Sequence, residues 1–509
     1  MSFSAGKSVD WPNSTTENED EKFTNELRRE KSSAEDVEAS VPVPGHTISS
    51  QLESQEVYQL RDVTTANGQV ETYKIVVFSP NDKANPKNWS KARRWLITMT
   101  LSLVCFSVAF SSAVVTPGIA GVAESFHVSS EVALLSVTLF VIGFGIGPLV
   151  FSPLSELYGR WIIYVATFGF AVIFIIPCAV AKNIETLLLC RAIGGIAISV
   201  PVANIGGSLA DMWKPEERGI PMASFSAAPF LGPIMGPMIG GFVYENIGWR
   251  WLYWLQLILC GTFFVAILLF VPETYAPVIL ETRAKKLRKQ TGDHSYKGEH
   301  ELLRRSFKNI ARVHLARPLL LLFTEPIVTL FAIYAAILYG ILYIYPIVFE
   351  EGKGYSAGIS GLMFLPITGG IILGLLGAPM VNRQYIRKRS KYTGLPPPEL
   401  RLLPMIWVGP CLAGFPIGVG FVFLYNSFNN YIVDAYQHTA ASALAAKTLL
   451  RSIWGGSTVL FTTQMYHNLN PRWASSLLAF LALACCAIPF TFYQFGAAIR
   501  KHSKYAYSE

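Results

Sequence analysis

The chain has 509 residues, of which 51% are hydrophobic and only 15% are charged, and its mean hydropathy is +0.38. Soluble globular domains carry about 25% charged residues. This composition therefore excludes an ordinary soluble enzyme or binding domain and indicates a membrane protein. Basic loops beside a membrane explain the formal net charge of +8 better than nucleic-acid binding does.

Residues 1–79 are polar, rich in Ser, Thr and Glu, and poor in sustained apolar periodicity. Such a segment buries too little apolar surface to offset the entropy cost of ordering it. The chain also does not begin with the charged and then apolar pattern of a cleaved signal peptide. We therefore expect a disordered cytosolic tail over residues 1–80.

A helix that crosses the bilayer core needs about 20 apolar residues. Such runs cover residues 95–117, 132–152, 161–181, 187–210, 219–244, 249–271, 319–349, 358–381, 402–425, 439–465 and 473–495. A polar, basic segment separates the sixth run from the seventh. The expected parts are thus an N-terminal six-helix bundle (94–272), a cytosolic linker (273–317), a C-terminal bundle (318–497) and a cytosolic tail (498–509).

Lys and Arg are concentrated before the first run, in the central linker, in residues 383–401 and after the last run. The intervening loops carry few cations. Because cytosolic loops are enriched in Lys and Arg, both ends of the chain and the linker are expected in the cytosol. Two bundles joined by a cytosolic linker are typical of a secondary transporter, although a membrane enzyme or receptor can have a similar layout.

Residues 230–241 read FLGPIMGPMIGG within an apolar run. Glycines four residues apart share one helix face and let two helix backbones approach closely in lipid. The prolines remove backbone donors, so neighbouring helices or water must satisfy the freed carbonyls. The pattern predicts a kinked helix that is packed against protein. The positions concerned are Gly232, Pro233, Gly236, Pro237, Gly240 and Gly241.

Two further motifs are GPLVFSPLSELYGR (147–160) and LLLCRAIGGIAISVP (187–201). With residues 230–241, they resemble the major facilitator superfamily, in the drug:proton antiporter branch found in fungi. Shorter matches follow in the same order: NPKNWSKARRW, GWRWLYWLQ, PETYAPVIL, PIVFEEGKGYS and NYIVDAYQHTAASALA. The resemblance implies an all-α membrane protein of two pseudo-symmetric helix bundles.

The resemblance also implies residue roles. Glu156, Gly159 and Arg160 would form a cytosolic latch between the bundles, and Arg191 would take part in proton coupling. The glycines and prolines of residues 230–241 would shape a helix bend that sets the direction of antiport. The alternatives are a weak surface ion pair at Glu156–Arg160 and an Arg191 side chain that reaches out to the membrane interface.

Four more residues are candidates for a substrate cavity. Lys447 and Arg451 lie one turn apart in the run 439–465 and can face a wet cavity. Tyr334 and Tyr339 can stack on flat or cationic compounds, although helix packing explains them equally well.

The chain departs from the family pattern in three ways. Trp161 stands where the family usually has a second arginine, which weakens the expected latch. The seventh run is about one helical turn, or four residues, short. The C-terminal bundle contains five apolar runs where six are expected, so a span and its turn, about 30 residues, are absent near residue 402.

The expected function is proton-coupled export of small hydrophobic or cationic compounds, such as drugs or secondary metabolites, at the plasma membrane or the vacuolar membrane. The alternatives are a polyamine or nutrient carrier, or a transport-inactive sensor, which the missing helix favours. The expected partners are a small-molecule substrate and the lipid bilayer, with no nucleic acid, and the protein is expected to be a monomer. The sequence has no GxxxxGK[ST] or HExxH motif and no CxxC pair, so it predicts no cofactor besides a proton gradient, no metal and no enzyme activity.

Overall fold

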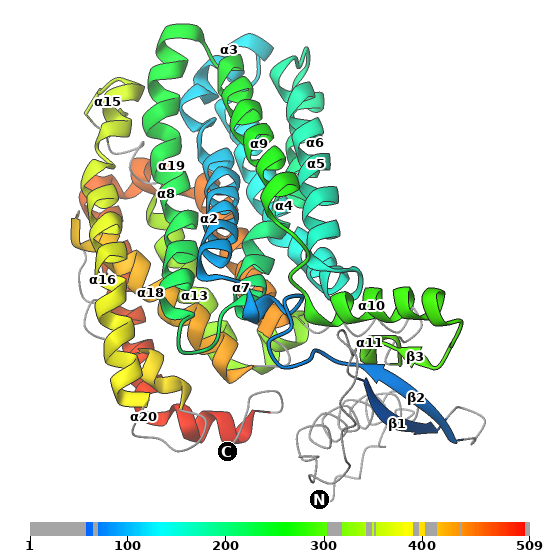
Figure 1. The fold of residues 1–509 in the computed structure, drawn as a ribbon. Helices are drawn as coiled ribbons and strands as arrows, with labels where there is room; N and C mark the ends of the chain where they lie inside the picture. The colour runs from blue at the N-terminus through cyan, green and yellow to red at the C-terminus, as the bar shows by residue number, and fades with distance from the viewer. Residues whose placement is uncertain are drawn as a thin grey trace, which may run out of the picture. The chain divides into compact units, whose positions relative to one another are not determined.

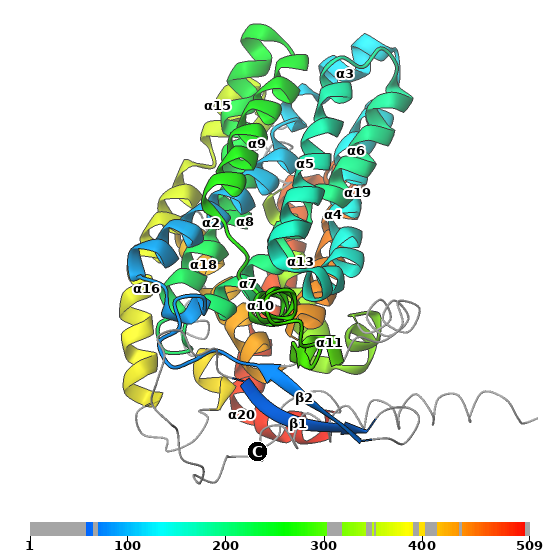
Figure 2. The same cartoon turned by 45° about the vertical axis from the view of Figure 1, so that its right-hand side comes forward.

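The computed structural model describes residues 58–64, 70–302, 318–342, 349–350, 353–389, 397–402, 415–436 and 440–503. Long helices make up most of these residues, and a small sheet precedes them in the chain (Figures 1 and 2). Two parts of the sequence that bear on the missing helix, 343–348 and 403–414, lie outside the described residues.

The helices of the first half match the six expected spans. They are α2 (Lys91–Ala113), α3 (Ile119–Phe126), α4 (Ser130–Tyr158), α5 (Arg160–Ala179), α6 (Ile184–Ile198), α7 (Val200–Met212), α8 (Gly219–Ile247) and α9 (Arg250–Phe270). Short 3-10 turns, η1 (Pro86–Asn88) and η2 (Thr116–Gly118), precede α2 and α3. With α2–α3 and α6–α7 each taken as one segment, six segments are long and apolar enough to cross a membrane.

The second half is less regular. Its elements are α13 (Pro326–Leu342), α15 (Ala357–Leu362), α16 (Leu365–Arg389), η4 (Pro398–Leu402), α18 (Phe415–Ala435), α19 (Ala440–Cys485) and α20 (Ala487–His502). Two segments of this half, Ala357–Arg389 and Trp473–Lys501, pass as membrane spans by length and composition. The described residues therefore contain eight such spans, or nine if one bent helix pair is counted.

The bent pair corrects the expectation of one straight span over residues 319–349. The helical segments Pro318–Thr324 and Pro326–Leu338 meet at an angle of 95°. Glu325 lies at the break and precedes Pro326, and a proline disfavours helical geometry at the residue before it. The Glu325 side chain is buried and accepts a hydrogen bond of 2.9 Å from the Tyr436 hydroxyl. A buried polar contact therefore stabilises the bend.

A second difference concerns the end of the chain. The runs 439–465 and 473–495 were expected as separate helices, but α19 is helical throughout its 46 residues and includes the residues between the two runs. The first of these runs is not among the segments apolar enough to be counted as a span. The charged residues Lys447 and Arg451 lower the hydropathy of this run, and neighbouring helices bury both side chains. The last helix, α20, ends at His502, beyond the expected bundle limit of 497.

The structure also differs from the expected disordered tail. Strands β1 (Tyr58–Thr64) and β2 (Val70–Val76) pair antiparallel, and β3 (Tyr296–Lys297) of the linker adds parallel to β2. The segment VETYKIV of β2 contains β-branched and aromatic residues, which suit a strand. We name these strands the hairpin–linker sheet. Helix α10 (Ala276–Thr291) lies next to it and runs across the direction of the long helices (Figures 1 and 2).

The two halves meet along α8 and α4. Helix α8 packs against α15, α16 and α18 of the second half, and α4 packs against α19. In Figure 1, α16 lies at one edge, α5 and α6 lie at the other, and α8 lies between them. Candidate residues on α4, α8, α18 and α19 are therefore placed at the interface between the halves.

Candidate functional site

The glycine- and proline-rich motif of residues 230–241 lies within helix α8. The helix is continuous over 29 residues despite Pro229, Pro233 and Pro237. A Cβ atom at Gly232 would lie 2.5 Å from the backbone nitrogen of Phe110 on α2. Gly236 and Gly240 face α2 in the same way, with Val114 at 2.9 Å and 2.5 Å. The prediction of a glycine face packed closely on protein is confirmed, and α2 is its partner.

The next face of α8 touches the other half. A Cβ atom at Gly241 would lie 2.5 Å from the carbonyl oxygen of Ala357 at the start of α15. One at Gly361 on α15 would lie 2.6 Å from Met238 Cα and 2.8 Å from the Pro237 carbonyl oxygen. Real Cβ atoms do not approach other atoms this closely, so the motif holds α8 between α2 and α15.

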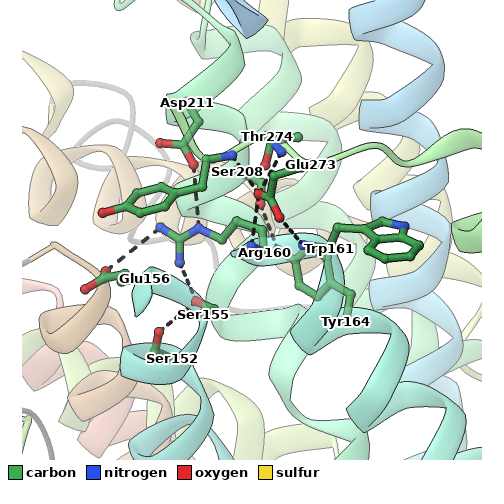
Figure 3. A network of polar contacts seen from close by, with 11 residues as sticks. Ser152, Ser155, Glu156, Arg160, Trp161, Tyr164, Ser208, Asp211, Glu273 and Thr274 are labelled. Carbon is green, nitrogen blue, oxygen red and sulfur yellow. Dashed lines mark hydrogen bonds and ion pairs between the residues drawn. The ribbon is translucent and has the colours of Figure 1, made fainter. Parts of the chain in front are cut away.

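Arg160 is the centre of a polar network at the end of α4 and the start of α5 (Figure 3). Its side chain is buried, and Nη1 donates a 2.7 Å hydrogen bond to Ser155 Oγ. The guanidinium lies 3.6 Å from the Asp211 carboxylate and 3.9 Å from that of Glu156. The structure thus brings Glu156 and Arg160 together as expected and adds Asp211.

Glu273 is the second residue of this network that the sequence analysis missed. Its carboxylate accepts hydrogen bonds from the backbone N–H groups of Arg160 (3.0 Å), Trp161 (3.1 Å), Thr274 (2.9 Å) and Tyr275 (2.8 Å). A carboxylate at the first turn of a helix satisfies donors that have no partner within the helix. Glu273 therefore ties the start of α5 to the start of the linker.

Gly159 is required at this junction. Its φ is +104°, in the region that favours glycine, and a Cβ atom would lie 2.3 Å from Glu273 Oε2. The Trp161 side chain points away from Arg160, so its indole takes no part in the network (Figure 3). The partners of Arg160 described here all come from the first half and the start of the linker. They link the N-terminal bundle to the linker.

A different charged cluster connects the two halves. Arg218, which precedes α8, pairs with Asp434 near the end of α18. Arg401 of η4 donates to the same carboxylate at 3.0 Å and to the carbonyl oxygen of Pro215 at 3.4 Å. We name Arg218, Asp434 and Arg401 the inter-half cluster. Asp434 lies within the family-like segment NYIVDAYQHTAASALA, but no signal in the sequence pairs it with Arg218.

A polar cavity adjoins the inter-half cluster. Gly219 of α8, Asn382 and Tyr385 of α16, and Asn426 and Asn430 of α18 all line it. Its charged lining residues are Lys388 and Arg401. Because both halves contribute to its wall, this cavity changes shape if the halves move relative to one another.

Arg191 of α6 lies inside the first half. Its side chain is 2% exposed, so it does not reach out to the membrane interface. Nε donates to the carbonyl oxygen of Ser136 at 3.0 Å, and Nη1 donates to the carbonyl oxygen of Ser111 at 3.2 Å and to Gln256 Oε1 at 3.4 Å. The guanidinium also lies 3.9 Å from the centre of the Phe140 ring. One side chain therefore connects α2, α4, α6 and α9.

Of the four candidate cavity residues, Lys447 and Arg451 lie together on α19, and each is 1% exposed. Tyr334 lies elsewhere in the second half, where its ring packs 5.5 Å from Phe428 and its hydroxyl lies 3.6 Å from Cys486 Sγ. These contacts favour the helix-packing interpretation for Tyr334. The side chain of Tyr339 lies outside the described residues.

The chain matches the family model of the Major Facilitator Superfamily over residues 101–460. It is 51% identical to the MFS-type transporter paaT of Penicillium rubens, over 88% of this chain and 86% of that protein. It is 43% identical to the multidrug transporter mdrA of Aspergillus fumigatus, over 85% of this chain and 76% of that protein. It is 40% identical to Polyamine transporter 3 of Saccharomyces cerevisiae, over 85% of this chain and 74% of that protein. The chain therefore belongs to the Major Facilitator Superfamily and is a multi-pass membrane transporter, not an enzyme.

Proposed function

We propose that the protein exports small organic compounds across the plasma membrane in exchange for protons. The similarity to mdrA, which is named a multidrug transporter, supports export of compounds of this kind. The close packing of α8 on α2 of one half and on α15 of the other supports an alternating-access mechanism. Transporters built from two bundles expose a midplane site to each side in turn by moving one bundle against the other.

The observation that carries proton coupling is the burial of Arg191. An ionisable side chain inside a membrane is costly and is by default a functional candidate. A guanidinium remains protonated in proteins, so Arg191 does not carry the transported proton itself. It acts instead on its surroundings: its positive charge and its hydrogen bonds to α2, α4 and α9 make the packing of these helices sensitive to a proton bound nearby.

The two clusters of charged residues have distinct roles in this proposal. The Arg160 network joins the N-terminal bundle to the linker through Glu273. The inter-half cluster joins the two halves through the carboxylate of Asp434, which contacts both Arg218 and Arg401. Movement of the halves must break the contacts of the second cluster. Arg218 and Asp434 therefore act, in this proposal, as a latch between the halves in addition to the one expected at Glu156 and Arg160.

The test is dye efflux from cells that lack their own drug pumps. Cells that express the protein should retain less dye than cells with empty vector, and a protonophore should abolish the difference while ATP is maintained. Arg191→Ala should lose export, and Arg93→Ala, at an exposed arginine of α2, should keep it. If the surface-localised protein changes dye retention no more than empty vector does, the proposed export is wrong. If export survives the protonophore, proton coupling is wrong.

A further inference from the structure

Helix α10 of the linker carries five cations and a single acidic residue, Glu281. Two of the cations pair with carboxylates of neighbouring elements. Arg283 pairs with Asp82 of the segment before α2. Arg288 pairs with Glu301 of α11 (Glu299–Leu302) at 2.8 Å. The other three cations are exposed, and we name them the lysine stripe: Lys285, Lys286 and Lys289.

The opposite side of α10 packs on the hairpin–linker sheet. Ala284 is fully buried, and Arg288 Nη1 donates a 2.8 Å hydrogen bond to the carbonyl oxygen of Tyr296 in β3. A Cβ atom at Gly298 would lie 3.0 Å from Glu281 Cα. With 3.6 residues per turn, the three lysines fall within about 100° of one another and outside this packed face. The stripe therefore does not point into the sheet.

The lysine stripe is largely unneutralised by the protein. Lys285 pairs at 2.7 Å with Glu281, one turn earlier on the same helix. Among the residues that the structure describes, Lys286 and Lys289 form no ion pair. Since α10 has no second acidic residue, this side of the helix keeps a net positive charge.

The position of α10 places this charge beside the bilayer. The membrane span α9 ends at Phe270, and α10 begins soon after it, at Ala276. Helix α10 runs across the direction of the long helices, and in Figure 1 its C-terminal half extends beyond α5 and α6. The hairpin–linker sheet lies on the side of α10 that faces away from the long helices (Figures 1 and 2). The projecting half of α10 thus has the sheet on one side and the membrane surface on the other.

We propose that the lysine stripe binds the headgroups of anionic phospholipids in the cytosolic leaflet. The concentration of Lys and Arg in the linker predicts that it is cytosolic, and the cytosolic leaflet carries anionic lipids. Each ammonium group offers three donors to the phosphate or carboxylate oxygens of a headgroup. The attraction of such a surface extends only over a Debye length, about 8 Å at physiological salt, so a helix beside the bilayer lies within its range. This inference does not rest on the proposed export.

Lipid binding would have a structural consequence for the linker. The Glu273 carboxylate accepts hydrogen bonds from the backbone N–H groups of Arg160, at the start of α5, and of Tyr275, directly before α10. Arg283 ties the same helix to Asp82. A lipid-bound α10 would therefore hold the linker to the membrane beside the N-terminal bundle.

Hydrogen exchange measures this contact without any transport step. The purified full chain is placed in nanodiscs of phosphatidylcholine alone or of phosphatidylcholine mixed with phosphatidylserine. The anionic lipid should slow exchange of the α10 amides about fivefold for each lysine that contacts it. High salt should reduce the slowing, because salt screens exposed charges. Amides of α5 in the same sample serve as the internal control.

Paired variants separate charge from other effects. Lys286→Gln with Lys289→Gln should abolish the slowing, and Lys286→Arg with Lys289→Arg should keep it, because arginine retains the charge. Lys285 stays unchanged in both, since it pairs with Glu281. The matched control is Lys182→Gln with Lys353→Gln, at exposed lysines in loops expected on the other side of the membrane, and it should also keep the slowing.

A stripe that is only a solvated face would respond alike to both membranes. Equal exchange in neutral and anionic nanodiscs would therefore overturn the inference, as would slowing that survives in the double glutamine variant or at high salt. Inorganic phosphate added to neutral nanodiscs should leave exchange unchanged. Slowing by phosphate alone would show a general anion site and would also overturn the assignment to lipid.

Discussion

Gly241 of α8 lies directly against Ala357 of α15, so that a Cβ atom on the glycine would come within 2.5 Å of the Ala357 carbonyl oxygen. This contact joins the two halves of the transporter. Because the obstructing atom belongs to the backbone, it cannot move aside as a flexible side chain would. The approach of α8 to α15 therefore depends on the absence of a side chain at residue 241.

The first prediction is that Gly241→Ala impairs export. The added methyl group holds α8 away from α15 and hinders the closed state, while contacts within each half remain. Efflux rates should fall several-fold at equal surface expression. Gly261→Ala is the matched control, because nothing lies within 4 Å of a Cβ atom at that glycine of α9. Equal efflux from both variants would show that the α8–α15 contact is unimportant for transport.

The second prediction concerns stability within the first half. Gly232→Ala places a methyl group 2.5 Å from the backbone nitrogen of Phe110 on α2. Overpacking of this kind costs about 1–3 kcal/mol. The purified variant should therefore melt at a lower temperature than the unchanged protein, whereas Gly261→Ala should not. An unchanged melting temperature for Gly232→Ala would contradict the close packing of α8 on α2.

The third prediction compares how strongly two carboxylates near Arg160, those of Glu273 and Glu156, stabilise the start of α10. Glu273 accepts four backbone hydrogen bonds, whereas the Glu156 carboxylate lies 3.9 Å from the guanidinium and its side chain is 30% exposed. Glu273→Ala should release the start of α10, seen as faster hydrogen exchange in residues 274–280. Glu156→Ala should change exchange there little, since exposed ion pairs contribute under about 1 kcal/mol. The opposite ranking would refute the assignment of Glu273 as the link to the linker.

The fourth prediction is the pH range of the hairpin–linker sheet. The hydrogen bond from Lys74, 2.8 Å long, lowers the pKa of Asp293 below its ordinary value of 3.8. The same bond raises the pKa of Lys74 above its ordinary value of 10.5. The carboxylate thus contributes stability above pH 3.8, which is lost as the pH falls through its lowered pKa. The ammonium contributes below pH 10.5, and that contribution is lost as the pH rises through its raised pKa.

Protection of the β2 amides against hydrogen exchange should accordingly stay constant from about pH 5 to about pH 9. Asp293→Asn should lower this protection throughout the range, while amides of α5 in the same sample serve as the internal control. If protection of β2 falls between pH 5 and pH 9 in the unchanged protein, another group with a pKa in that range must hold the sheet.

The helices of the first half could be predicted because each apolar run is long enough to span a bilayer and ends at polar residues. The close face of α8 could be predicted because the spacing of Gly232, Gly236 and Gly240 is itself the signal. The hairpin–linker sheet was not predicted, because β1 and β2 lie within a long polar segment and the third strand is only two residues long and about 220 positions later in the chain. The bend at Glu325 was missed since its hydrogen bond with Tyr436 is a tertiary contact.

The residues of the candidate site were likewise predicted only in part. Arg191, Lys447 and Arg451 stand out in the sequence because charge is rare within apolar runs, and Arg160 stands out because it ends the motif of residues 147–160. Their partners do not stand out: Asp211 sits at the end of a run, and the pairing of Arg218 with Asp434 joins residues of different halves.

The measurement that tests proton-coupled export most directly is transport into proteoliposomes under an imposed pH gradient without ATP. Fluorescein and rhodamine 6G are added outside vesicles whose lumen is acidic. The account predicts dye accumulation that depends on the gradient and disappears with a protonophore or in the Arg191→Ala variant. Accumulation that is unchanged when the gradient is collapsed, or that persists in Arg191→Ala, would contradict it.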